Sequence, residues 1–98
     1  MATVGGQMTI QGYQKPLGHI QITSLGSAVG MTVPDKARLA IIQAQAQNVR
    51  WRDDGVNPTT SVGMIITAGD QLFYTGNMEA IKFIEVTASA VLNIAFYE

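Results

Sequence analysis

Short segments in which apolar and polar residues alternate fill the chain from His19 onward. Turn-forming Gly, Pro, Asn, Asp and Ser residues separate them at intervals of about ten residues, which is the pattern of half-buried strands. The segments predicted as strands are His19 to Leu25, Ala28 to Val33, Leu39 to Gln45, Val49 to Asp53, Val62 to Thr67, Gln71 to Thr75, Ala80 to Thr87 and Val91 to Tyr97. The sequence therefore predicts an all-β fold, an antiparallel β-sandwich or jelly roll of seven to eight short strands.

A helix competes with a strand only in the segment Lys36 to Asn48. Its Ala, Leu, Gln and Arg residues favour helices, and Asp35 could cap one. However, the residues after Ile42 alternate strictly between Gln and Ala and supply no second apolar turn. We therefore expect a strand here, with Ala40 and Ala44 on the same face as Ile42.

The segment Val49 to Asp53 should place Trp51 in the core, because alternation puts Arg50 and Arg52 on the opposite face. A loop rich in turn formers then runs from Asp53 to Ser61. Nine such residues exceed the length of most hairpin loops, so we expect an exposed loop that contacts a partner. The candidate contact residues in it are Asn57, Pro58, Thr59 and Thr60.

The residues Met1 to Gly18 form a separate region rich in Gly and Gln. We expect an extended N-terminal arm over residues 1–18 and a sandwich domain over residues 19–98, with a short edge strand possible at Thr9 to Tyr13. Ordinary terminal disorder and docking onto a partner are both open. If the arm docks, its candidate contact residues are Met8, Ile10 and Tyr13.

Composition excludes several classes of function. The 98 residues leave room for one domain, and 47% apolar residues indicate a folded chain. Six basic and seven acidic residues give a net charge of −1, which offers no basic surface for nucleic acid or an anionic membrane. No apolar run reaches the roughly 18 residues of a membrane span. The chain has no cysteine, so disulfides and thiolate chemistry are excluded.

No catalytic or metal-binding pattern is apparent in the sequence. The single histidine, His19, lies far along the chain from Asp53, Asp54 and Asp70, and no triad is supported. Adjacent carboxylates at the end of a strand point in opposite directions, and the residues after Asp54 do not match a calcium loop. We therefore expect no enzyme activity, no cofactor and no metal site.

Two aromatic patterns have both a functional and a structural interpretation. Arg50-Trp51-Arg52 could contact single-stranded nucleic acid, but alternation separates the indole from both arginines and Asp53-Asp54 offsets their charge. Tyr74 and Tyr97 could form a sugar-stacking platform with Trp51, although buried aromatic rings are the commoner case. We expect a core Trp51, with the arginines paired on the outer face.

The second half of the chain carries a resemblance to a known group of proteins. Its residues are the run Ala44 to Gly55, then Asn57-Pro58-Thr59, Ser61 to Met64, Tyr74-Thr75-Gly76, Ala80 to Ile84 and Leu92 to Tyr97. Together they resemble small structural proteins encoded among the virion genes of tailed bacteriophages. The stretch Trp51 to Met64 is the most specific part, and the resemblance covers Ala40 to Glu98.

The resemblance implies a virion component, and we expect a capsid decoration (cement) protein that binds and stabilises the assembled shell. An extended arm could pair with the exposed sheet edge of a neighbour. The expected partners are the major capsid protein or another virion protein and further copies of the chain itself, as a trimer or another symmetric homo-oligomer. The protein would be made in the bacterial host cytoplasm and reside on the capsid surface. A head-tail or tail component and a carbohydrate-binding sandwich that aids host attachment are the alternatives.

Overall fold

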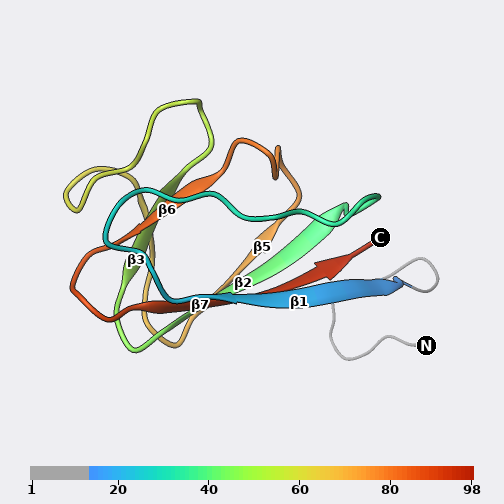
Figure 1. Cartoon of the computed structure of the whole chain (residues 1–98), viewed down its shortest axis with the longest axis horizontal. Helices are drawn as coiled ribbons and strands as arrows, with labels where there is room; N and C mark the ends of the chain where they lie inside the picture. The colour runs from blue at the N-terminus through green and yellow to red at the C-terminus, as the bar shows by residue number, and fades with distance from the viewer. Residues whose placement is uncertain (1–13) are drawn as a thin grey trace.

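The computed structural model describes residues 14–98, which fold into two antiparallel sheets without a helix (Figure 1). The strands are β1 (Pro16–Ile22), β2 (Leu39–Gln45), β3 (Val49–Arg52), β4 (Met64–Ile66), β5 (Gln71–Tyr74), β6 (Lys82–Glu85) and β7 (Val91–Tyr97). One sheet has the strand order β1-β7-β2-β5, and the other has the order β4-β3-β6. The predicted all-β fold is confirmed as a small β-sandwich of seven strands.

The four-stranded sheet is built around β7, which pairs with β1 on one side and β2 on the other. Both β7 and β2 have the bounds predicted from their alternation. Their inward-facing side chains are fully buried: Ala40, Ile42 and Ala44 from β2, and Leu92, Ile94 and Phe96 from β7. Alternation of small and large residues lets the two strands fill one side of the core.

The three-stranded sheet supplies the other side of the core from β3 and β6. Val49 and Phe83 are completely buried, and Ile81 joins them from just before β6. Apart from the Tyr74 hydroxyl, the buried side chains of the described chain are apolar, so burial leaves few polar groups that require a partner. Cutting a buried Phe back to Ala in such a core costs about 3–5 kcal/mol.

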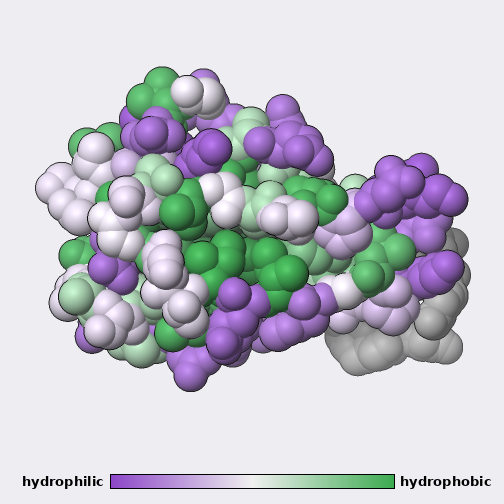
Figure 2. Space-filling view, in the orientation of Figure 1, coloured by the Kyte–Doolittle hydropathy of each residue, from purple (hydrophilic) through white to green (hydrophobic). Residues whose placement is uncertain are grey.

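The predicted strand Ala28 to Val33 is wrong. Only Val29 pairs, exchanging two backbone hydrogen bonds of 2.9 and 2.8 Å with Phe83 of β6. Gly30 follows at once and lies against Lys82, and a glycine within a strand weakens pairing. Val29, Met31 and Val33 nevertheless pack partly buried against the core. Figure 2 shows apolar side chains across the middle of this face of the molecule.

The first strand was predicted at His19 to Leu25, but β1 begins at Pro16 and ends at Ile22. Leu25 is buried because the chain crosses to the other sheet there, and its carbonyl accepts a hydrogen bond of 2.9 Å from the Glu85 amide. The strand therefore includes Pro16 to Gly18 of the predicted arm. Residues Met8, Ile10 and Tyr13 and the possible strand Thr9 to Tyr13 lie outside the described residues.

Two further predicted strands are shorter than their apolar runs. Val62 and Thr67 flank β4, but each of them bonds within a turn. Val62 and Thr59 exchange backbone hydrogen bonds before the strand, and after it the Thr67 carbonyl accepts a hydrogen bond from the Asp70 amide. Ala80 likewise lies in a turn before β6, with its amide bonded to the Asn77 carbonyl at 3.1 Å. Local turn hydrogen bonds thus replace ladder pairing at these ends.

Candidate functional site

The loop from Asp53 to Gly63 is held onto β3 by one arginine. The Arg50 guanidinium donates from Nε to the Thr60 carbonyl at 3.1 Å and from Nη1 to the Gly63 carbonyl at 2.7 Å. Hydrogen bonds from a charged donor are stronger than neutral ones. The expected pairing of this arginine on the outer face is confirmed, and it fixes both ends of the Thr60 to Gly63 segment.

Thr59 closes a tight turn within the same loop. Its hydroxyl accepts hydrogen bonds from the amides of Ser61 at 3.2 Å and Val62 at 3.0 Å, and its own amide donates to the Val62 carbonyl at 2.9 Å. Gly63 has φ +140°, and a Cβ there would lie 3.1 to 3.2 Å from the Trp51 carbonyl and from the Cβ atoms of Arg50 and Pro58. The positive φ and this close packing both favour glycine at position 63, where the loop folds back onto β3.

Exposed apolar side chains gather in this part of the sequence. Of the five large apolar residues that are exposed in the described chain, four belong to this loop and β4: Val56, Val62, Met64 and Ile65. Met64, at 62%, is the most exposed of them. We call the segment Asp53 to Ile65 the 53–65 surface. It presents apolar groups on an ordered loop and an edge strand.

The predicted contact residues of the loop do not all reach its surface. Asn57, Thr59 and Thr60 are exposed, whereas Pro58 is buried. Pro58 packs beneath the loop beside Gly63, so its side chain supports the loop and offers no contact area in this conformation. Sequence reasoning missed the exposed Val56, because it lies inside a run of polar turn formers.

A hydrogen bond from Tyr74 of β5 connects the four-stranded sheet to the start of this loop. The Tyr74 hydroxyl lies 2.7 Å from Asp53 Oδ2 and 3.2 Å from the Asn77 carbonyl, and its single proton is directed to the nearer carboxylate. Burial, aided by the hydrogen bond and charge of Asp53, raises the pKa of Tyr74 to about 12. The ring meets Trp51 edge to face at a centroid distance of 5.8 Å.

This arrangement corrects one prediction and excludes one alternative. Trp51 does not fill the core, because it is half-buried at its margin. The sugar-stacking platform does not form, because Tyr74 is only 6% exposed and faces the core beside Ala40, whereas Tyr97 of β7 lies on the opposite face of the sheet. Adjacent carboxylates do point to different partners, as expected: Asp53 accepts from Tyr74, and Asp54 pairs with Arg52 at 2.5 Å.

The Arg52–Asp54 ion pair is fully local and solvent-exposed. Two hydrogen bonds join the groups, and they hold the pKa of Asp54 below its ordinary value and that of Arg52 above its own. The pair confirms the expected role of the second arginine. It also neutralises both charges where the loop begins, so little net charge is left beside the 53–65 surface.

The outer face of the four-stranded sheet is the second notable surface. Residues paired across antiparallel strands point to the same side of a sheet. The pairing registers therefore place one row of His19, Ala95, Ile41 and Phe73 beside a row of Gln21, Asn93, Gln43 and Gln71. Leu39 with Tyr97, and Gln45 with Val91, complete the face. None of these side chains is Asp, Glu, Lys or Arg.

Carboxamide groups form a chain of hydrogen bonds across this outer face. Gln21 Nε2 donates to Asn93 Oδ1 at 2.9 Å, and Asn93 Nδ2 donates to Gln45 Oε1 at 2.9 Å and more weakly to Gln43 Oε1 at 3.5 Å. Sequence reasoning placed Gln43 on the opposite side from Ile42 but did not identify the face. Recognising it requires knowing that β7 lies between β1 and β2.

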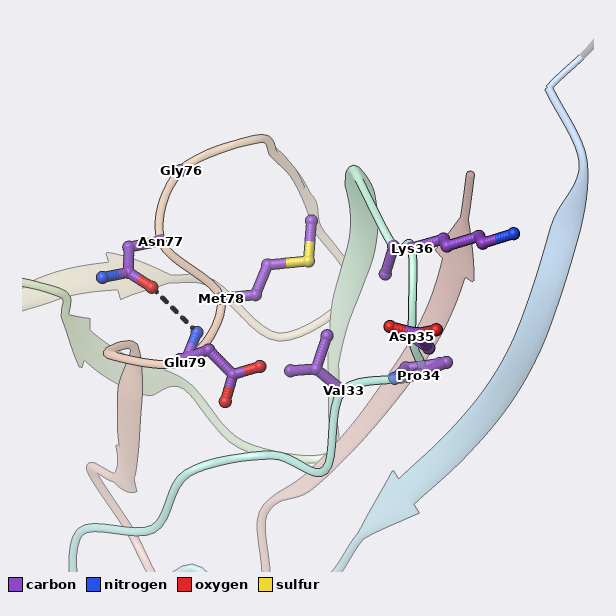
Figure 3. Close-up of a pocket in the computed structure, with 9 residues that line it drawn as sticks. Val33, Pro34, Asp35, Lys36, Gly76, Asn77, Met78 and Glu79 are labelled. Atoms are coloured by element: carbon purple, nitrogen blue, oxygen red, sulfur yellow. Dashed lines mark hydrogen bonds between the residues drawn. The ribbon is translucent and has the colours of Figure 1, made fainter.

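One open cleft lies between the turn before β2 and the loop after β5 (Figure 3). It has a volume of about 390 Å³ and is lined by Val33 to Ala37 and Gly76 to Glu79. The Glu79 amide is bonded to Asn77 Oδ1 at 3.1 Å, and Lys36 extends away from that loop. The cleft therefore offers two separate carboxylates, Asp35 and Glu79, without a convergent set of ligands.

Within residues 14–98, no three His, Cys, Asp or Glu side chains lie close enough to hold a metal ion. His19 stands on the outer face next to Ala95, away from the loop carboxylates. None of the described elements is a helix that could cross a membrane. Apolar groups, amides and hydroxyls predominate at both surfaces, beside the Asp53 and Asp54 carboxylates at one and the His19 imidazole at the other.

We compared the chain with protein-family models, with curated proteins and with solved structures. None of the three comparisons gave a match.

Proposed function

We propose that this chain is a structural protein of a phage virion, a capsid decoration protein that binds the assembled shell through the 53–65 surface. The stretch that carries the resemblance to virion proteins, Trp51 to Met64, is the same stretch that builds this surface. The partner would be the major capsid protein or another protein of the shell.

The observation that carries the proposal is an ordered loop with apolar side chains directed to solvent. Arg50 and Thr59 fix its backbone, while Val56, Val62 and Met64 are 51 to 62% exposed. A preorganised loop loses little conformational entropy on binding. Apolar groups held in water by a rigid backbone are typical of a surface that is covered in the functional assembly.

Binding of this kind would stabilise a shell by mass action. A protein that contacts two neighbouring subunits binds only the assembled state and shifts the equilibrium towards it. Because the contact is mainly apolar and Arg52 neutralises Asp54, we expect attachment to change little with ionic strength. The predicted arm contacts Met8, Ile10 and Tyr13 would add to this attachment.

The test is co-sedimentation of the purified protein with phage heads that lack it. The variant Val56→Thr/Met64→Gln removes apolar area from two exposed positions and leaves every described hydrogen bond in place. Each side chain is about half exposed, so covering both contributes about 2 kcal/mol, and the double variant should bind roughly 30-fold more weakly. Its melting temperature should match that of the unmodified chain.

Phe73→Gln is the matched control, because within residues 14–98 Phe73 is the one exposed large apolar residue outside the 53–65 surface, and it lies on the opposite sheet, on β5. It should bind heads normally. Loss of binding by Phe73→Gln with normal binding by the double variant would refute the assignment of the surface. Imaging of complete particles would reveal a head-tail or tail position by its low copy number, and would replace the decoration proposal with that alternative.

A further inference from the structure

The outer face of the four-stranded sheet has a composition unlike that of an ordinary solvated surface. Six basic and seven acidic residues are spread over the chain, yet none points outward from this face. Solvent-exposed surfaces of soluble domains are about 25–35% charged. Depletion of charge together with exposed aromatic rings is characteristic of the centre of a protein interface.

We propose that this outer face binds the same face of a second copy of the chain. A two-fold interface sets each surface against itself, so its groups must be self-complementary. Carboxamides meet this requirement because each one donates and accepts hydrogen bonds. Gln21, Gln43 and Gln71 can therefore bond to their counterparts, whereas charged residues in these positions would meet like charges.

The neighbouring row adds the apolar part of the interface. Ile41 and Ala95 form its centre on β2 and β7, and Phe73 is 54% exposed at the β5 edge. Opposed copies of this row would cover all three side chains. The amide of Asn93 is already occupied by Gln21 and Gln45, so these bonds link β1, β7 and β2 across the face before a partner arrives.

The size of the face sets the strength of the contact. The four strands are spaced about 4.8 Å apart; β1, β2 and β7 have seven residues each and β5 has four. At about 3.3 Å per residue the face spans at most about 19 by 23 Å, or roughly 440 Å². Stable interfaces bury about 800 Å² on each partner. The dimer should therefore be weak and concentration-dependent. It uses a different surface from shell attachment, so either proposal can fail while the other stands.

The experiment is sedimentation velocity of the full chain from about 1 µM to about 1 mM. Gln43→Glu puts a charge near the middle of the face while preserving an acceptor for Asn93. Gln43→Lys puts the opposite charge there. Gln47→Glu is the matched control, since it makes the same chemical change after β2, outside the face.

We expect the unmodified chain and Gln47→Glu to dimerise alike, and each Gln43 variant to dimerise at least about tenfold more weakly. An equimolar mixture of the two Gln43 variants should recover dimers, because opposite charges then face each other. Unchanged melting temperatures will show that the variants are folded.

A monomer at every concentration of the unmodified chain would overturn the proposal, as would full dimerisation of Gln43→Glu. Retention of a monomeric chain on a neutral polysaccharide, lost on Gln43→Glu substitution, would also overturn it and assign the face to a saccharide.

Discussion

Removing the Tyr74 hydroxyl tests how the two sheets are joined at the start of the loop. In Tyr74→Phe the ring keeps its place at 6% exposure and its edge-to-face contact with Trp51. The variant loses only the hydrogen bond to Asp53 at 2.7 Å and the longer contact to the Asn77 carbonyl. Its effect on the free energy of unfolding therefore reports the hydroxyl alone.

The expected magnitude at neutral pH follows from this geometry. A hydrogen bond to a charged group contributes about 1.5–3 kcal/mol when it is well buried. Asp53 is exposed, so water can hydrate its carboxylate once the hydroxyl is gone. We therefore expect Tyr74→Phe to lower the free energy of unfolding by about 1–1.5 kcal/mol at pH 7.

At alkaline pH the difference in the free energy of unfolding between Tyr74→Phe and the unmodified chain should change sign. The pKa of Tyr74 is raised from 10.0 to about 12 in the folded chain, so the folded state binds this proton more tightly than the unfolded state. The resulting stability is fully present below pH 10 and is lost as the pH rises to 12. The loss amounts to about 2–3 kcal/mol. Tyr74→Phe lacks this titration. As the pH rises, the free energies of unfolding of the two chains should therefore become equal, and at still higher pH the variant should be the more stable chain.

Urea unfolding monitored by Trp51 fluorescence at several pH values from 7 to 12 measures both effects. Other tyrosines and lysines titrate in the same range, but they are common to both chains and cancel in the difference. The reasoning is refuted if the difference in unfolding free energy stays constant from pH 9 to 12.

Two further predictions concern packing and the ends of the chain. Phe96→Ala should lower the free energy of unfolding by about 3–5 kcal/mol, whereas Trp51→Ala should lower it by about 2 kcal/mol because Trp51 is only half-buried. Urea unfolding followed by circular dichroism measures both values, and equal losses would place Trp51 in the core. A chain that begins at Gln14 should stay soluble, keep its melting temperature and bind heads more weakly, because it retains the 53–65 surface but lacks the arm contacts. Truncation after Ala90 removes β7 and should give an insoluble product. Full-strength head binding by the first variant or folding of the second would contradict these expectations.

The strands that pair on both sides were the most predictable from the sequence. For β7, alternation of Leu92, Ile94 and Phe96 with smaller or polar residues gave the correct bounds, because one face is buried along its whole length. The segment Ala28 to Val33 has similar apolar residues but only one paired position. Apolar content predicts burial there, and Gly30, the residue after the single paired position, weakens further pairing.

The candidate site was predictable in position but not in construction. The turn formers between Asp53 and Ser61 indicated a long exposed loop, and an exposed loop is present. Its order depends on Arg50 reaching carbonyls ten and thirteen residues away, and sequence alone does not reveal such contacts. The depth of Trp51 and the burial of Pro58 likewise depend on how the loop folds back over β3.

The position of β7 between β1 and β2 has a consequence for biosynthesis. β1 and β2 do not pair with each other, because β7 lies between them in the same sheet. That sheet cannot be completed until β7 has left the ribosome. Pairings between residues so distant in sequence form slowly, because the connecting chain must first be brought together. During synthesis, β1, β2 and β5 would stand as unpaired or half-paired edges that can bind other nascent chains. The four-stranded sheet therefore cannot close before β7 is available, and the yield of folded protein is expected to depend on how quickly β7 inserts.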